Sequence, residues 1–203
     1  MSAVGSPKYA EIPLLLAGAL DDKHKGQLVA ISALQKLPGK YVLHVVGDGD
    51  DQDLIENFAG SLGLSSRVKL FPWSRLAELL RAERYFCALV PSRHEGLGSL
   101  LIDLMRWRLP IIASNVGGIP DLIRHGDTGI LCEPGDYECI TSQIEALFAN
   151  PGMREKLVES AYQESLRFSP ETMFDQYMDV YRSLSRDFYE GDKRATGGEI
   201  GEK

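Results

Sequence analysis

Residues 90–103 read Val-Pro-Ser-Arg-His-Glu-Gly-Leu-Gly-Ser-Leu-Leu-Ile-Asp, an apolar segment that runs into a glycine-spaced turn and then into a helical pattern. The apolar segment begins at Phe86 and suits a strand that is buried on both faces. Gly96 and Gly98 keep the backbone of the turn free of side chains, so that a ligand can approach it closely. The unpaired N–H groups at the start of the next helix favour an anion. The stretch therefore predicts a phosphate-binding turn between a strand and a helix.

The same alternation of strand and helix continues on both sides of this turn. We expect strands at 13–18, 41–47, 68–71, 85–91, 110–114 and 129–132, with helical segments between them, and three closing helices at 136–149, 153–168 and 170–188. Helices that separate strands in this way indicate right-handed βαβ units. We therefore expect an α/β protein, a Rossmann-like three-layer α/β/α domain with a parallel sheet of about six strands that the C-terminal helices close.

Length and composition limit the number of domains and the kinds of partner. With 203 residues, of which 44% are hydrophobic, the chain has the size of one large domain. We expect a flexible lead-in at 1–11, one domain at 12–188 and a disordered acidic and glycine-rich tail at 189–203. The net charge of −7 and the lack of a basic cluster argue against nucleic acid and anionic membrane surfaces as general partners.

The cysteines and histidines show no spacing typical of a metal or redox site. Cys87 lies in an expected buried strand, and Cys132 and Cys139 lie apart at a strand end and a helix start. All three are predicted to be buried free thiols of a reducing compartment. No signal segment and no apolar run long enough to cross a bilayer is found in the sequence. A cytoplasmic location is therefore expected.

Polar or glycine-containing loops follow the expected strands. They contain Lys25, Gly47 to Gly49, Pro72-Trp73, Glu95 to Gly98 and Gly117-Gly118. Ligands of open parallel sheets bind outside the carboxyl ends of the strands. We therefore expect these loops to converge on one edge of the sheet and to form a ligand site there.

Several motifs together carry a resemblance to a known family. Residues 91–103 contain Pro-Ser, Glu-Gly-Leu-Gly and a later Asp, and residues 110–121 read Pro-Ile-Ile-Ala-Ser-Asn-Val-Gly-Gly-Ile-Pro-Asp. Lys25-Gly26, Gly47-Asp48-Gly49 and Gly129-Ile130-Leu131 agree with the family in order and spacing. Across about residues 14–184, the chain closely resembles the donor half of the family-four retaining glycosyltransferases, which have the GT-B fold.

The resemblance implies a function and a set of partners. The co-substrate would be a nucleotide-diphosphate-sugar, used without a cofactor or an obligatory metal in polysaccharide or glycoconjugate biosynthesis. The acceptor would be held by an N-terminal domain or a partner subunit that this chain does not contain. That missing half could also attach the protein to the periphery of a membrane.

The resemblance also implies roles for individual residues. Lys25 and Glu95 are the implied catalytic residues: the lysine would hold the donor diphosphate as a point charge, and the glutamate would hydrogen-bond the hydroxyls of the transferred sugar. Asp103 falls where a family glutamate takes the ribose hydroxyls, and Trp73 falls beside the nucleotide base. The implied substrate-binding set is Gly18, Lys25, Gly47, Gly49, Trp73, Glu95, Gly96, Leu97, Gly98, Ser99, Asp103, Gly117 and Gly118.

Two positions depart from the family pattern. Ala19 stands where the family carries an arginine, and Asp103 is one methylene shorter than the usual glutamate. Both departures suit an alternative, a catalytically inactive module that binds a nucleotide-sugar or acts as a scaffold. A nucleotide-sugar epimerase of the same fold is a third possibility, although the spacing from Glu95 to Asp103 fits the transferases better.

The helix at 170–188 carries a broad apolar stripe, which we expect to be partly exposed or covered by a second copy of the chain.

Overall fold

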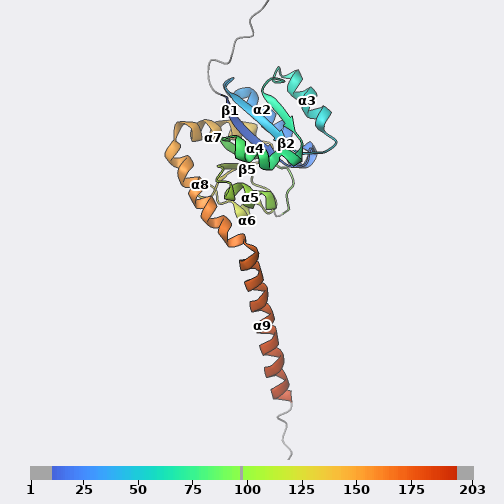
Figure 1. Ribbon diagram of the computed structural model, residues 1–203, viewed down its shortest axis with the longest axis vertical. Helices are drawn as coiled ribbons and strands as arrows, with labels where there is room; N and C mark the ends of the chain where they lie inside the picture. The colour runs from blue at the N-terminus through green and yellow to red at the C-terminus, as the bar shows by residue number, and fades with distance from the viewer. Residues whose placement is uncertain (1–10, 97, 196–203) are drawn as a thin grey trace, which may run out of the picture. The chain divides into compact units, whose positions relative to one another are not determined.

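The computed structural model describes residues 11–96 and 98–195 (Figure 1). Its strands are β1 (Ile12–Ala17), β2 (Tyr41–Val46), β3 (Val68–Phe71), β4 (Cys87–Val90), β5 (Ile111–Ser114) and β6 (Ile130–Cys132). They form one six-stranded sheet in the order β3-β2-β1-β4-β5-β6, and every neighbouring pair is parallel. The predicted α/β class and the parallel sheet are confirmed.

The helices also follow the predicted order. Between the strands lie α1 (Asp22–Lys25), α2 (Gln27–Lys36), α3 (Gln52–Ser61), η1 (Trp73–Arg75), α4 (Leu76–Ala82), α5 (Ser99–Arg106) and α6 (Ile119–Leu122). After β6 come α7 (Tyr137–Ala149), α8 (Pro151–Ser165), η2 (Leu166–Phe168) and α9 (Pro170–Ala195). The last helix extends past its predicted end at 188, into the segment expected to be a disordered tail. Most of the expected lead-in, residues 1–10, and the end of the expected tail, residues 196–203, lie outside the described residues.

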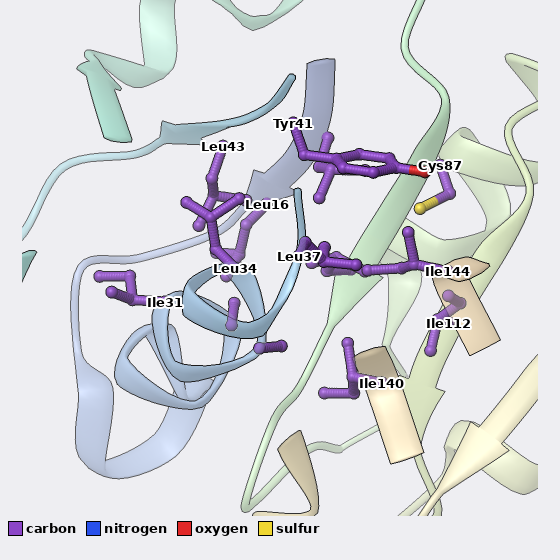
Figure 2. Close-up of a cluster of buried hydrophobic side chains, with 14 of the residues drawn as sticks. Leu16, Ile31, Leu34, Leu37, Tyr41, Leu43, Cys87, Ile112, Ile140 and Ile144 are labelled. Carbon is purple, nitrogen blue, oxygen red and sulfur yellow. The ribbon is translucent and has the colours of Figure 1, made fainter. Parts of the chain in front are cut away.

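Alternate side chains of each strand enter two hydrophobic clusters, one on each face of the sheet. Leu14 and Leu16 of β1 pack in a cluster with residues of α2, α3 and α7, and Figure 2 shows Leu16 among these side chains. Leu15 between them packs in the other cluster, with residues of α4, α5 and α6. Because both faces are covered by helices, the strands are apolar almost throughout, as parallel strands usually are. The predicted three-layer arrangement is confirmed.

The chain divides into two compact units, residues 1–165 and residues 166–203. The sequence predicted a single domain at 12–188, whereas the sheet and α1–α8 form the first unit and α9 belongs to the second. The apolar side chains of the predicted stripe on α9 are more than half exposed: Met173, Phe174, Tyr177, Val180, Tyr181 and Leu184. Whether a second copy of the chain covers them stays a prediction. None of the described helices, α9 included, has both the length and the apolarity that crossing a membrane requires.

Two of the three cysteines form a disulfide, so the prediction of free thiols is wrong for them. β6 ends at Cys132 and α7 begins at Tyr137, and the turn between them brings Cys139 back until the two cysteine Cα atoms are 5.9 Å apart. Spacing along the sequence does not reveal this pairing, because it depends on the direction of the turn. Cys87 is free and buried as predicted, and burial raises the pKa of its thiol. The cysteines therefore give no support to a reducing compartment, and the cytoplasmic location stays a prediction.

Because His44 of β2 is buried, we expect the protein to lose stability in acid. Its Nδ1 lies 3.0 Å from the Tyr85 hydroxyl, and its Nε2 has no hydrogen-bond partner among the described residues. Burial lowers the pKa of His44, and Lys69 lowers it further, while Glu83 and Glu11 act in the opposite direction. The His44 imidazole therefore takes up a proton more readily in the unfolded state than in the folded state. The contribution to stability is complete above the ordinary imidazole pKa of about 6.5 and is lost as the pH falls below it, by at most about 1.4 kcal/mol per pH unit.

Urea unfolding at several pH values between about 5 and 8 would measure this loss. His44→Phe keeps a ring against Phe71, which the imidazole contacts edge-on in the native protein. We expect the free energy of unfolding of this variant to depend less on pH than that of the wild type. Equal slopes in the two proteins would contradict the assignment of the acid sensitivity to His44.

Candidate functional site

A pocket lies where the strand order reverses, between β1 and β4. The strands on either side are connected in opposite directions, which leaves a crevice at the carboxyl edge of the sheet beside the loops after β1 and β4. The crevice has a volume of about 370 Å³. Loops after four strands contribute to its lining, with Ala19 after β1, Asp48 after β2, Trp73 after β3 and Ser92 after β4.

The pocket brings together only part of the predicted site. Its lining includes Gly18, Lys25, Trp73, Glu95, Gly98 and Ser99. Asp103 is exposed on α5, one helical turn beyond Ser99, and lies outside this lining. Leu97 lies outside the described residues. The nucleotide-ribose contact of Asp103 and the base contact of Trp73 stay predictions.

The remaining predicted glycines, Gly47, Gly49, Gly96, Gly117 and Gly118, also lie outside the lining. They join neighbouring loops by close backbone contact. A Cβ atom on Gly47 would lie 1.8 Å from the carbonyl oxygen of Gly18, and one on Gly117 would lie 1.8 Å from that of Glu95. Gly118 donates its N–H to the Gly96 carbonyl at 2.8 Å. These glycines therefore hold the pocket loops in place.

Replacing Gly47 with alanine is expected to lower stability by about 2–3 kcal/mol, because the new methyl group would overlap the backbone of the β1 loop. For a chain of this length, the melting temperature should fall by roughly 5–10 °C. Gly39→Ala is the matched control, since a Cβ atom there meets nothing within 4 Å. Differential scanning calorimetry of both variants decides the matter, and equal melting temperatures would show that the β1 and β2 loops do not pack as described.

Lys25 and Glu95 form an ion pair inside the pocket. The Lys25 ammonium donates to Glu95 Oε2 at 2.7 Å, and the two side chains are 29% and 16% exposed. Ser92, which is buried, donates from Oγ to the same carboxylate oxygen at 3.3 Å. The backbone N–H groups of Arg93 and His94 donate to the His24 carbonyl at 2.8 and 3.2 Å. The loops after β1 and β4 are thus bonded to each other, and they place a cation and a carboxylate side by side.

Two buried polar residues support the loops that carry this ion pair, and neither of them was predicted from the sequence as a site residue. Gln27 begins α2, is fully buried and donates from Nε2 to the Ala19 carbonyl at 2.7 Å, which fixes the loop after β1. Its Oε1 has no hydrogen-bond partner among the described residues. Ser92 stands three residues before Glu95, so the two side chains are close along the chain. No sequence signal points to Gln27.

A histidine pair lies beside the ion pair. His24 is hydrogen-bonded to Asp21, at 2.6 Å from Nδ1 to Oδ2, and this bond lowers the pKa of the Asp21 carboxyl. The rings of His24 and His94 meet edge-on, with their centres 5.6 Å apart. Among residues 11–96 and 98–195, no three His, Cys, Asp or Glu side chains gather as they would around a metal ion. Independence from a metal stays a prediction.

The comparisons with known proteins agree with this geometry. Residues 7–164 match the family described as Glycosyl transferases group 1. The chain is 28% identical over 176 residues to the lipopolysaccharide core biosynthesis glycosyltransferase LpsE of Rhizobium meliloti, which covers 86% of this chain and 51% of that protein. It is 36% identical over 152 residues to the N-acetyl-alpha-D-glucosaminyl L-malate synthase of Bacillus anthracis, which covers 71% of this chain and 38% of that protein.

A solved structure shows the same fold. The crystal structure of Anabaena Alr3699/HepE in complex with UDP superposes with a TM-score of 0.78 at 24% sequence identity, and covers 85% of this chain and 49% of that one. The chain therefore spans about half, or less, of the length of the proteins it matches.

Proposed function

The chain belongs to the group 1 glycosyl transferases, and we propose that it is the donor-binding half of a retaining glycosyltransferase. One observation carries this proposal: Lys25 and Glu95 are paired at 2.7 Å in a pocket at the reversal of strand order, beside the start of α5. A nucleotide-diphosphate-sugar needs such a set of groups. The cation and the backbone N–H groups at the start of a helix suit the diphosphate, and the carboxylate suits the sugar hydroxyls.

The ion pair fits this role by exchanging partners. When a diphosphate enters, the Lys25 ammonium can turn from the Glu95 carboxylate to the phosphate oxygens, which carry more charge. The carboxylate is then free to accept hydrogen bonds from sugar hydroxyls. During transfer, the leaving diphosphate gains negative charge, and Lys25 and the first N–H groups of α5 are placed to stabilise it. Such preorganised charge stabilisation is commonly the largest catalytic contribution.

The acceptor site belongs, in this proposal, to a separate half of the enzyme. The chain covers only 51% of LpsE and 49% of HepE, which supports an N-terminal acceptor domain or a partner subunit. The name of LpsE assigns it to lipopolysaccharide core biosynthesis, which favours glycoconjugate synthesis for this chain as well. UDP, the ligand of the HepE structure, is the first nucleoside diphosphate to test.

The chain alone should bind UDP or another nucleoside diphosphate, yet transfer no sugar at a useful rate, because productive attack needs donor and acceptor in one closed cleft. Isothermal titration with a panel of nucleoside diphosphates and their sugars tests binding. Transfer of labelled sugar, with and without an added N-terminal half, tests catalysis. Efficient transfer by the chain alone would show that it is not half of an active site. If no member of the panel bound to the chain, the proposal would be refuted.

The second candidate is an inactive nucleotide-sugar-binding module. The exposed Ala19 favours it, since this position lines the pocket and offers no side-chain donor to a phosphate. The same experiment separates the two functions. Binding that persists without any transfer after the N-terminal half is added would support the module.

A further inference from the structure

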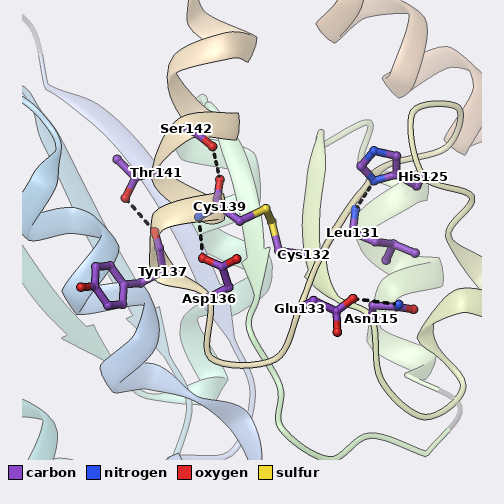
Figure 3. Close-up of a disulfide and its surroundings, with 10 residues drawn as sticks. All are labelled: Asn115, His125, Leu131, Cys132, Glu133, Asp136, Tyr137, Cys139, Thr141 and Ser142. Carbon is purple, nitrogen blue, oxygen red and sulfur yellow. Dashed lines mark hydrogen bonds between the residues drawn. A yellow bond between two sulfur atoms is a disulfide. The ribbon is translucent and has the colours of Figure 1, made fainter.

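The disulfide joins the end of β6 to the first turn of α7 (Figure 3). Cys132 is 3% exposed, whereas Cys139 is partly exposed. The Cys139 N–H donates to the Asp136 carboxylate at 2.8 Å, which caps α7. The disulfide thus closes the short turn at 133–138 and adds a covalent link between β6 and α7 to that of the main chain.

The loop after β5 is bonded to this turn on two sides. The Asn115 N–H donates to the Cys132 carbonyl at 2.7 Å, and its side-chain amide donates to the Glu133 carboxylate at 3.3 Å. Figure 3 shows the side chains of Asn115 and Glu133 next to each other, joined by this hydrogen bond. Asn115 is therefore bonded both to a cysteine of the disulfide, next to the pairing of Ser114 with Cys132 in the sheet, and to the first residue of the turn that the disulfide closes.

The same loop contacts the turn that carries Glu95. Gly117 packs so closely on the Glu95 backbone that a Cβ atom would lie 1.8 Å from its carbonyl oxygen. Gly118 donates its N–H to the Gly96 carbonyl at 2.8 Å. A continuous series of backbone contacts thus runs from Cys132, through residues 115–118, to the backbone of Glu95, whose side chain pairs with Lys25.

We infer that Cys132 and Cys139 form a reversible redox-modification site, and that their disulfide braces residues 115–118 against the Glu95 turn. The co-reactant is a dithiol. One of its thiolates attacks Sγ of the more exposed Cys139 and forms a mixed disulfide, and Cys132 leaves as a thiolate that takes up a proton. The second thiol of the reductant then attacks the mixed disulfide and releases Cys139. Both electrons come from the dithiol, which ends as a disulfide, while the protein ends with two thiols.

Hydrogen exchange measured by mass spectrometry tests the brace without any nucleotide. Dithiothreitol should reduce the disulfide, as counted with a thiol reagent, and should speed amide exchange in the peptide containing residues 115–118 by about tenfold. Cys132→Ser with Cys139→Ser should show the fast exchange in both the presence and the absence of dithiothreitol. Two free thiols at these positions under an oxidised glutathione buffer, or unchanged exchange at 115–118 after full reduction, would overturn the inference.

A second measurement tests the link to the donor pocket and rests on the proposed function. UDP affinity of the wild type should fall roughly fivefold or more on reduction, and that of the double serine variant should not respond. Faster exchange with unchanged UDP affinity would show that the brace does not reach Glu95, and would overturn that link. Faster exchange in a protein that binds UDP in neither state would uphold the brace and refute the proposed function.

Discussion

UDP binding is expected to weaken roughly 10- to 150-fold when Lys25 is replaced with alanine, which corresponds to about 1.5–3 kcal/mol. The ammonium lies in the pocket at the reversal of strand order, and its side chain is only 29% exposed. A charge-assisted bond to the diphosphate is therefore less screened than one on an open surface. The loss of affinity also includes repulsion between the Glu95 carboxylate and the incoming phosphates, because the ammonium that lies 2.7 Å from this carboxylate in the wild type is gone. Isothermal titration measures the change directly.

Two controls separate this effect from a general loss of structure or charge. Lys23→Ala removes an exposed lysine from the same short helix and should leave UDP affinity within about twofold of the wild type. Uridine lacks phosphates, so its binding should not distinguish Lys25→Ala from the wild type. If uridine and UDP lost affinity equally, Lys25 would have no diphosphate role.

The fold could be predicted because the strands are apolar on both faces. Leu14, Leu15 and Leu16 are consecutive and fully or almost fully buried, and they divide between the two hydrophobic clusters. Such strands suit only a sheet that is covered by helices on both sides, and helical segments between strands make that sheet parallel. The extent of α9 was less predictable, since its last residues are charged and polar, and a helix of this composition differs little in sequence from a disordered tail.

The meeting of Lys25 and Glu95 in the candidate site could be predicted for a topological reason. Lys25 and Glu95 are 70 residues apart, yet each follows a strand that flanks the reversal of strand order, so the fold brings their loops together. What the sequence did not show was the direct ion pair between them. Two side chains that each suit a ligand can equally well bond to each other when the pocket contains no ligand. Only the geometry of the loops reveals such an ion pair.

The glycines and cysteines were harder to assign because their roles depend on neighbouring loops. A glycine that admits a ligand and one that admits another backbone look the same in sequence, and the structure shows a close backbone neighbour at Gly47 and at Gly117. Their contact with a ligand stays a prediction. Cys132 and Cys139 likewise pair only because the turn between them reverses the chain. These features depend on contacts between loops, which periodicity and spacing along one chain do not encode.

Replacing Glu95 with glutamine should separate recognition of the diphosphate from recognition of the sugar. In the unliganded protein the carboxylate holds the Lys25 ammonium at 2.7 Å, so a diphosphate must compete with it. The neutral amide competes far less, and UDP should bind as tightly as in the wild type or up to about tenfold more tightly. A nucleotide-sugar, however, loses its charged hydrogen-bond acceptor. The ratio of its affinity to that of UDP should therefore fall by about tenfold or more.

Titration of both proteins with UDP and with the UDP-sugar that binds the wild type most tightly gives this ratio. Asp103→Asn is the matched control, since a ribose contact is common to both ligands and its loss would change both affinities together. A fall in UDP affinity of Glu95→Gln would show that the carboxylate supports the diphosphate site, and an unchanged ratio would show that Glu95 does not contact the sugar. The predicted outcome requires both that Lys25 is released and that the sugar loses its acceptor, so it tests the exchange of partners on which the proposed chemistry depends.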